Sequence, residues 1–374
     1  MKTMKIDPVA LTKKLITFDT TARATEKKCA AFLIEILRKA KFNIECFELE
    51  PGRTNIIADF PGTAKDLPIC FTGHMDIVPF GDAAWTKKPL GAEISGDKLY
   101  GRGSSDMKSG VAAMISAAVS ATSSKPLKRG IKLAITAAEE ESCRGTKFMC
   151  ENKLFKGGAG AIVVCEPTSN YPYVGHKGSL WVKLSFKGVS AHGSMPEKGV
   201  SAIYKAAEAA LRLRDLKFTA KNKILGSATI NVGKIEGGVN YNLVPDHAAL
   251  YVDIRSVPEI THKEILSAVR KITGKDASFD IVDDNCGFVS NPSDPWIKKV
   301  FGIYQEQGFV KPSLKGLTYF TDAVSLRKAF GDPPTIIMGP GEALQAHKTD
   351  EFCYVSKITE AAKIYRAVIA DWCF

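Results

Sequence analysis

Short apolar runs recur along the chain and are separated by segments with helical periodicity. The runs cover residues 44–49, 55–60, 67–72, 131–136, 161–165 and 335–338. Helical stretches such as Gly110 to Ala121 lie between several of them, and short continuous apolar runs are typical of strands buried on both faces of a sheet. The pattern predicts an α/β fold built on a mixed sheet with at least some parallel strands.

Two helix starts are visible near the beginning of the sequence. Asp7 followed by Pro8 is typical of an N-cap and the first helical position. Thr25 precedes a long amphipathic stretch that ends near Lys41, and we expect Thr25 to cap this second helix.

Residues 177–284 follow a different order of elements. We expect strands at 180–186, 227–235, 248–255 and 277–282, with helices at 201–213 and 261–272. This order is β-α-β-β-α-β, a ferredoxin-like domain. A chain of 374 residues favours two domains over one. We therefore predict a larger domain formed by residues 1–176 and 285–374, interrupted by a smaller inserted domain at 177–284.

Charge and cysteine usage narrow the functional classes. The net charge is +11, but the basic residues are scattered in short pairs, which is typical of a solvated surface and not of a nucleic-acid site. Nine cysteines without a CxxC pair indicate reduced thiols. We see no apolar segment of signal-peptide or membrane-spanning length. The expected location is the cytoplasm, with neither nucleic acid nor membrane as a partner.

Histidine and acidic residues follow four of the apolar runs. They are His74 and Asp76, Glu139 and Glu140, Glu166, and His347. Ligands of open α/β sheets bind at the carboxyl ends of the strands. Taken singly, each residue has an ordinary interpretation as a hydrogen-bonded or solvated side chain. Four such placements in one chain favour a metal site.

A fifth candidate, Asp106, lies in the glycine-rich segment GRGSSDMKSG. A carboxylate has two oxygens and can bridge two cations, so we predict that Asp106 is shared by two divalent ions. Each ion would also receive one histidine and one glutamate, and a water between them would attack a carbonyl. Zinc suits these donors best, with cobalt and manganese as alternatives.

Glu139 and Glu140 are expected to divide two tasks. Adjacent side chains of an extended segment point in opposite directions. Glu140 would then bind metal, while Glu139 stays unligated and serves as the general base.

Six segments resemble the signatures of the metallopeptidase family that contains acetylornithine deacetylase, succinyl-diaminopimelate desuccinylase, aminoacylase and glutamate carboxypeptidase. They are FTGHMDIVP (71–79), YGRGSSDMKSG (100–110), TAAEEESCRGT (136–146), CEPTS (165–169), GVSAHGSMPEKG (188–199) and GPGEALQAHKTDEF (339–352). The resemblance implies a zinc-binding α/β domain with a lid that forms a homodimer interface. It also implies the same five ligands, Glu139 as the base, and Asp76 as the carboxylate that orients the His74 imidazole.

The resemblance also assigns residues of the lid. His192 would reach the active site of a partner subunit and stabilise the oxyanion. Asn242 and Arg255 would hold the carboxylate of the substrate. The remaining histidines, His176, His247 and His262, carry no motif and are expected to be structural.

Glu166 bears on the substrate class. Relatives that are dipeptidases or tripeptidases tend to have aspartate at this position, whereas deacylases and glutamate carboxypeptidases tend to have glutamate. The sequence therefore favours a di-metal amidohydrolase that removes the acyl group from an N-acyl amino acid. The LTYFTDAVSL segment (317–326) departs from the glycine-rich form typical of succinyl-diaminopimelate desuccinylase. A carboxypeptidase or dipeptidase, whose substrate is a short peptide with a free carboxylate, is the first alternative, and a non-catalytic metal-binding scaffold is the second.

Overall fold

The computed structural model describes residues 4–123 and 125–374, which form two compact units. The larger unit runs to Val174 and also includes Ser290–Leu314 and Thr321–Phe374. The smaller unit comprises Gly175–Val289 and Lys315–Phe320. Lys315–Phe320 was assigned to the larger domain from the sequence, but the structure places this segment in the smaller unit. This segment joins the smaller unit because the N–H of Leu317 donates to the carbonyl of Gly175.

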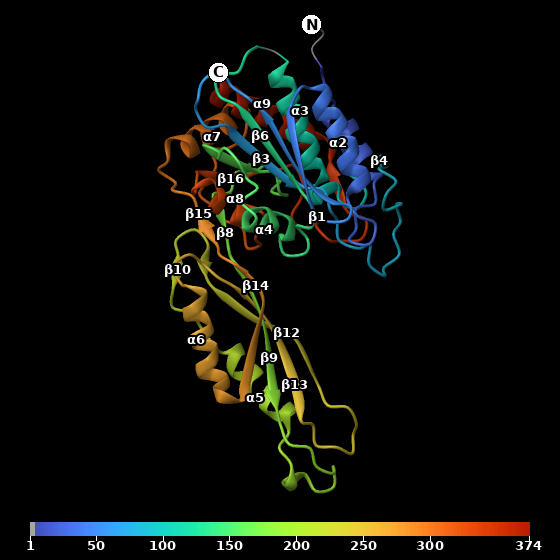
Figure 1. Ribbon diagram of the computed structural model, residues 1–374, viewed down its shortest axis with the longest axis vertical. Helices are drawn as coiled ribbons and strands as arrows, with labels where there is room; N and C mark the ends of the chain where they lie inside the picture. Colours follow the sequence, from blue (N-terminus) through green and yellow to red (C-terminus); the bar gives the residue numbers. More distant parts are fainter. Residues whose placement is uncertain (1–3, 124) are drawn as a thin grey trace. The chain divides into compact units, whose positions relative to one another are not determined.

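A six-stranded mixed sheet forms the centre of the larger unit, and the α/β fold predicted from the apolar runs is confirmed (Figure 1). The strands, in spatial order, are β1 (Asn43–Glu50), β2 (Arg53–Phe60), β6 (Ile131–Thr136), β3 (Ile69–His74), β7 (Ala161–Val164) and β16 (Thr335–Ile337). Strands β6, β3, β7 and β16 run parallel to one another. Strand β2 runs antiparallel to both of its neighbours, β1 and β6. The four parallel strands therefore end at the same edge of the sheet.

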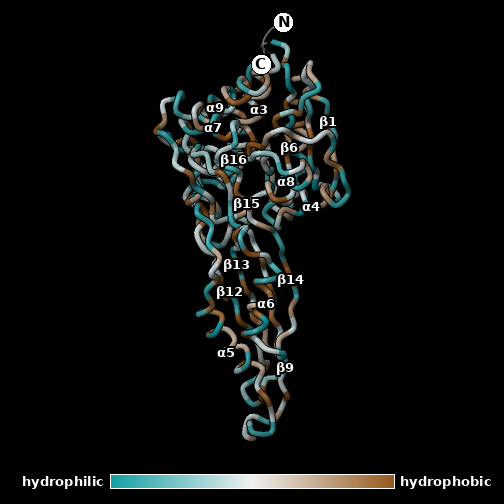
Figure 2. The backbone as a smooth tube through the Cα atoms, turned by 90° about the vertical axis from the view of Figure 1, so that its left-hand side faces the viewer, coloured by the Kyte–Doolittle hydropathy of each residue, from teal (hydrophilic) through white to brown (hydrophobic). Residues whose placement is uncertain are grey.

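Helices cover the sheet of the larger unit. They are α1 (Pro8–Ile16), α2 (Lys27–Lys39), α3 (Ser109–Thr122), α4 (Arg144–Glu151), α7 (Pro295–Glu306), α8 (Ala323–Phe330) and α9 (Val355–Cys373). Helix α3 packs against α1 and α9, and α4 packs against α8. Every residue of β3, β6, β7 and β16 is buried, so both faces of these strands are covered, and the tube around β6 is correspondingly apolar in Figure 2.

The two predicted helix starts have different outcomes. Asp7 caps α1, accepting a hydrogen bond from the backbone N–H of Val9 at 2.8 Å. The prediction that Thr25 caps α2 is wrong, because Thr25 has a left-handed backbone with φ of 65° and the N-cap position is Glu26. The Glu26 carboxylate makes no cap and instead pairs with the buried guanidinium of Arg53 at 2.8 Å.

The smaller unit has the predicted β-α-β-β-α-β order. Its elements are β9 (Ser179–Lys187), α5 (Ala202–Arg214), β12 (Thr229–Gly237), β13 (His247–Arg255), α6 (His262–Thr273) and β14 (Ala277–Asn285). The antiparallel sheet has the order β12-β13-β9-β14. Leu180, Val182, Leu184 and Phe186 of β9 are buried in the core beneath the two helices.

Short strands complete the two units. They are β4 (Ile94–Ser95), β5 (Lys98–Tyr100) and β17 (Phe352–Tyr354) in the larger unit, and β8 (Gly175–His176), β10 (Lys221–Asn222), β11 (Gly226–Ser227) and β15 (Phe288–Val289) in the smaller. Among the described residues, no helix is both long enough and apolar enough to cross a membrane.

Candidate metal centre

The parallel strands bring the sequence-predicted ligands of the larger unit together. His74 is the last residue of β3, Glu140 lies in the turn after β6, and Glu166 follows β7. His347 comes from the loop between β16 and β17. Because these strands are parallel and adjacent, side chains that are far apart in the sequence meet at one edge of the sheet.

Two groups of three potential ligands share Asp106. One contains His74, Asp106 and Glu166, and the other contains Asp106, Glu140 and His347. His74 Nε2 lies 3.2 Å from Asp106 Oδ1, whereas His347 Nε2 lies 3.4 Å from Asp106 Oδ2. The two oxygens of one carboxylate therefore face different histidines, which is the arrangement that a bridging ligand needs.

The other two carboxylates complete the groups. Glu166 Oε1 lies 3.9 Å from His74 Nε2, and Glu140 Oε2 lies 3.0 Å from His347 Nε2. The imidazole of His74 is buried, but the side chain of His347 is 55% exposed. One side of the cluster is therefore accessible to water and to a substrate.

The loop that carries Asp106 is held by Glu351, a residue that the sequence analysis missed. The buried Glu351 carboxylate accepts backbone N–H groups of Gly103 at 3.0 Å, Ser105 at 2.8 Å and Asp106 at 3.0 Å. It also pairs with the buried guanidinium of Arg102 at 2.9 Å. Glu351 follows His347 by four residues, and no spacing rule links it to a loop that lies so far away in the sequence.

Gly103 is required in this loop for two reasons. Its φ of 81° is a conformation that L side chains rarely adopt. A Cβ at this position would also lie 2.6 Å from Cγ2 of Ile77. A residue with a side chain would therefore disturb the loop that carries Asp106.

Asp76 holds the turn that carries the two glutamates. Its carboxylate accepts the backbone N–H of Glu139 at 3.1 Å and that of Glu140 at 3.0 Å. The His74 Nδ1 atom lies 3.0 Å from the carbonyl oxygen of Asp76 and 3.5 Å from its carboxylate. Asp76 therefore contacts the imidazole mainly through its backbone, while its carboxylate fixes the neighbouring turn.

The backbone at Glu139 and Glu140 is a turn and not the extended segment that we expected, because Ala138 preceding them has a φ of 55°. The two side chains nevertheless separate. Glu140 faces His347, whereas Glu139 groups with Cys143 and Asp322 and accepts a hydrogen bond from the Cys143 thiol at 3.4 Å.

Asp322 is a buried neighbour of Glu139 that was not predicted as a site residue. Its carboxylate accepts the hydroxyl groups of Thr136 and Thr146, each at 2.6 Å. Burial raises the pKa of Asp322 above its usual value. The candidate base Glu139 therefore has a second buried carboxylate, that of Asp322, next to it.

Burial and mutual repulsion shape the electrostatics of the site. Burial raises the pKa of Glu139 and Glu166 well above the usual value, and the charge of Asp106 adds to this effect at Glu166. Burial opposes ionisation of Asp106 too, but hydrogen bonds from His347 and His74 hold its pKa below the usual value. Hydrogen bonds to Asp106 and Glu140 raise the pKa of His347 to about 10.

These donors fit divalent cations. Each group offers one imidazole nitrogen and two carboxylate oxygens, all within 4.8 Å of one another, which matches the ligand chemistry of zinc. Positive charge between the carboxylates would also offset their repulsion.

The family model for peptidase family M20/M25/M40 matches residues 70–371. The chain belongs to this family. The matched range contains every candidate ligand, and so both of the ligand groups that share Asp106.

Two curated relatives of this M20-family chain are deacylating enzymes. Succinyl-diaminopimelate desuccinylase of Wolbachia pipientis subsp. Culex pipiens is 34% identical over 300 residues, covering 77% of this chain and 71% of the relative. Acetylornithine deacetylase of Vibrio campbellii is 30% identical over 346 residues, covering 89% and 88%. The M20-family chain is therefore a metal-dependent hydrolase that acts on linear amide bonds.

A solved structure shows the same fold. It is a dinuclear metal-binding M20 peptidase from Bacillus subtilis, with a TM-score of 0.73 and 14% identity, covering 97% of this chain and 96% of the other. The two adjacent ligand groups of the M20-family chain suit a dinuclear site.

The smaller unit carries the other three sequence-predicted residues. His192 is exposed, with Nδ1 2.7 Å from Ser194 Oγ, and it forms a β-bridge with Leu243 beside the exposed Asn242. Arg255 is the last residue of β13 and pairs with Asp253 at 2.9 Å. Asn242 precedes β13, whose nine residues span roughly 26 Å, so Asn242 and Arg255 of one chain lie too far apart to hold one carboxylate together.

Proposed function

We propose that this M20-family chain removes the acyl group from an N-acyl amino acid, using two divalent metal ions, preferably zinc. His74, Asp106 and Glu166 would hold one ion, and His347, Asp106 and Glu140 the other. The observation that carries this proposal is the division of the Asp106 oxygens between His74 and His347, at 3.2 and 3.4 Å. When bound, the ions would polarise the scissile carbonyl and acidify a water molecule.

Glu139 is the proposed general base. It stands outside both ligand groups that share Asp106, so its carboxylate is available to accept a proton from water and to pass it to the leaving amine. The pKa of Glu139 is raised well above the usual glutamate value, chiefly by burial, and a raised pKa makes the protonated carboxyl easier to form after the attack. Asp76 positions Glu139 through the backbone N–H at 3.1 Å.

Arg255 is proposed to bind the free carboxylate of the substrate. Its guanidinium is paired with Asp253 and lies 5.8 Å from the ring of Phe320, and its side chain is 25% exposed. A planar guanidinium with spare donors suits a carboxylate. Asn242 and His192 would contribute from a second copy of the chain, because they lie at the far end of β13 from Arg255.

A homodimer is therefore part of the proposal. Tyr204 and Leu211 are seven residues apart on α5, which places them on one face of the helix, and they are 73% and 56% exposed. Strand β12 is an edge of the four-stranded sheet and offers unpaired backbone groups. Two exposed apolar side chains on one helix face and a sheet edge in the same unit support self-association.

We further propose a cytoplasmic location. The nine cysteines are thiols outside any disulfide, and most are buried, which supports a reducing compartment.

A substrate panel tests this function. Zinc-loaded protein is given N-acetyl and N-succinyl amino acids, the same compounds with the carboxylate converted to an amide, and dipeptides. We expect the highest kcat/KM for an N-acyl amino acid, a large loss when its carboxylate is blocked, and a mainly increased KM in Arg255→Ala. Faster hydrolysis of dipeptides would replace the deacylase with a peptidase, and binding of metal without any turnover would favour the scaffold.

A further inference from the structure

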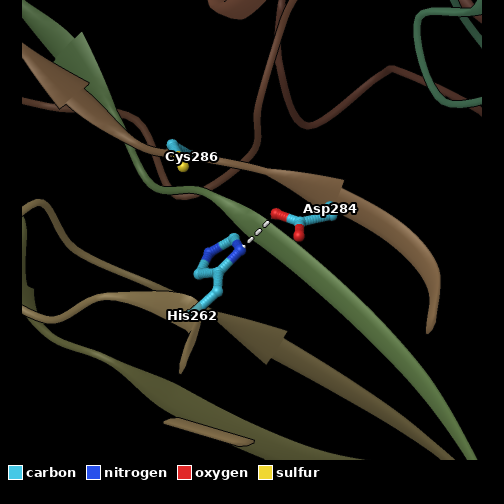
Figure 3. Close-up of side chains that lie close together, drawn as sticks. All are labelled: His262, Asp284 and Cys286. Atoms are coloured by element: carbon cyan, nitrogen blue, oxygen red, sulfur yellow. Dashed lines mark hydrogen bonds and ion pairs between the residues drawn. The ribbon is translucent and has the colours of Figure 1, made fainter. Parts of the chain in front are cut away.

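A second cluster of metal-type ligands lies in the smaller unit. It consists of His262, Asp284 and Cys286, whose ligand atoms all lie within 4.8 Å of one another. His262 is the first residue of α6, Asp284 belongs to the end of β14, and Cys286 follows that strand. Figure 3 shows the Asp284 carboxylate and the Cys286 thiol turned toward the imidazole.

The imidazole is held in one orientation by the buried side of the cluster. His262 Nε2 lies 2.7 Å from the hydroxyl of Ser256, which is buried, and His262 Nδ1 lies 2.5 Å from Asp284 Oδ1. A carboxylate only accepts hydrogen bonds, so Nδ1–H donates to Asp284 while Nε2 accepts from the Ser256 hydroxyl. A cation on Nδ1 would shift the ring proton to Nε2, which would then donate to Ser256. A histidine that binds a metal commonly donates its other N–H to a fixed polar group in this way.

The outer side of the cluster is open. Asp284 is 51% exposed and Cys286 is exposed, whereas His262 is only 9% exposed. The two outer ligands can therefore adjust by the tenths of an ångström that bonds of roughly 2.0 to 2.3 Å require. A fourth position is accessible to water.

We propose that His262, Asp284 and Cys286 bind one thiophilic divalent cation of the zinc and cobalt class. Imidazole nitrogen, carboxylate oxygen and thiolate sulfur are the three donor types that proteins use for zinc. When the cation binds, the Cys286 thiol would release its proton to solvent, and the resulting thiolate would form a metal–sulfur bond. This proposed role differs from the expectation that His262 is structural.

The ion would cross-link the first residue of α6, His262, to the end of β14. Ser256, which orients His262, follows Arg255 in the chain, so the cluster adjoins the end of β13 that carries the proposed carboxylate-binding residue. This site is separate from the ligand groups around Asp106 and does not depend on the proposed deacylase activity.

Cobalt(II) spectroscopy of the full-length protein tests the site, because thiolate ligation gives a near-ultraviolet charge-transfer band. The two ligand groups that share Asp106 contain no sulfur, but the group of Glu139, Cys143 and Asp322 contains one thiol. A band that depends on Cys286 and not on Cys143 therefore reports the smaller unit. In a non-thiol reductant, we expect the band in the unaltered protein and in Asp106→Asn. We expect its loss, with one equivalent less cobalt bound, in Cys286→Ser and in His262→Ala.

Two cysteine variants serve as controls. Cys46 is also exposed but lies on β1, so Cys46→Ser should keep the band. Cys143 lies beside Glu139 and Asp322 in the larger unit, so Cys143→Ser should keep it as well. The proposal is overturned if the unaltered protein shows no thiolate band, which would leave the cluster as a hydrogen-bond network, or if the band survives in Cys286→Ser. Failure of the deacylase proposal would appear instead as absent hydrolysis with the band intact.

Discussion

Glu351 accepts the backbone N–H of Asp106 at 3.0 Å, so the proposed bridging ligand is positioned by a carboxylate that itself touches neither histidine group. The same carboxylate binds the N–H groups of Gly103 and Ser105 and the Arg102 guanidinium. Glu351 is thus a positioning residue for the metal centre.

Replacing Glu351 by glutamine should weaken metal binding. The amide cannot match four donors as a carboxylate does, and loss of a supporting contact of this kind typically costs about 10- to 100-fold in metal affinity. Leaving the buried Arg102 charge unpaired should also lower the free energy of unfolding by about 3 to 5 kcal/mol. Zinc titration and denaturant unfolding of the metal-free protein measure the two effects.

The exposed Glu35–Lys39 pair provides a matched control. Glu35→Gln removes a carboxylate from an ion pair on the surface of α2 and should leave both quantities unchanged. Equal metal affinity in Glu351→Gln and Glu35→Gln would show that the Asp106 loop needs no such support.

Glu139 and Glu140 should respond differently to the same substitution. Glu139→Gln removes the proposed base and should lower kcat by about 10²- to 10⁴-fold while two ions remain bound. Glu140→Gln removes a proposed ligand and should lower the affinity for one ion. Metal content and kcat, determined side by side, separate the two roles, and equal loss of metal in both variants would refute the assignment.

Complementation between variants tests the composite site. His192→Ala and Glu139→Gln should each be nearly inactive alone. In a random mixture of dimers, about one quarter of the activity should return, because half of the dimers are mixed and each mixed dimer has one complete site. Activity is measured after the subunits are dissociated and reassembled. If no activity returns, His192 does not act across subunits.

The burial of Lys108 should make the stability of the protein depend on pH. Burial lowers its pKa to about 8 from the usual 10.5, and its ammonium donates to the Phe18 carbonyl at 2.8 Å. Between these two values the unfolded chain binds more protons than the folded chain, so this residue makes the free energy of unfolding rise with pH.

Metal-free protein and Lys108→Met are compared by denaturant unfolding across that window. The difference, unaltered protein minus variant, should increase by at most about 3 kcal/mol from pH 8 to 10.5. A difference that stays constant or falls would mean that the Lys108 ammonium is not destabilised by its burial.

Local patterns were sufficient to predict the strands of the six-stranded and four-stranded sheets and their order along the chain, but not the short strands of the two- and three-stranded sheets. The run at 131–136 became β6, because an apolar segment of this length is buried on both faces of a parallel sheet. The ends of such strands also placed His74 and Glu166 correctly at one edge. Thr25 was misassigned because its backbone is left-handed and the helix begins one residue later than expected, with Glu26 at the N-cap position.

The supporting residues of the site were beyond the reach of pattern analysis. Glu351 contacts the loop that carries Asp106, and Asp322 contacts Thr136 of β6 and Thr146 of α4. These partners are remote in the sequence, and no local spacing links them. The turn at Ala138 likewise could not be predicted, since nothing in a run of glutamates indicates a left-handed residue before it.

Anomalous diffraction from crystals of the zinc-loaded protein tests the central claim most directly. We predict two peaks roughly 3.5 to 4 Å apart on either side of the Asp106 carboxylate, one beside His74 and Glu166 and the other beside Glu140 and His347. A single peak, or none at these residues in the presence of excess zinc, would contradict the dinuclear mechanism.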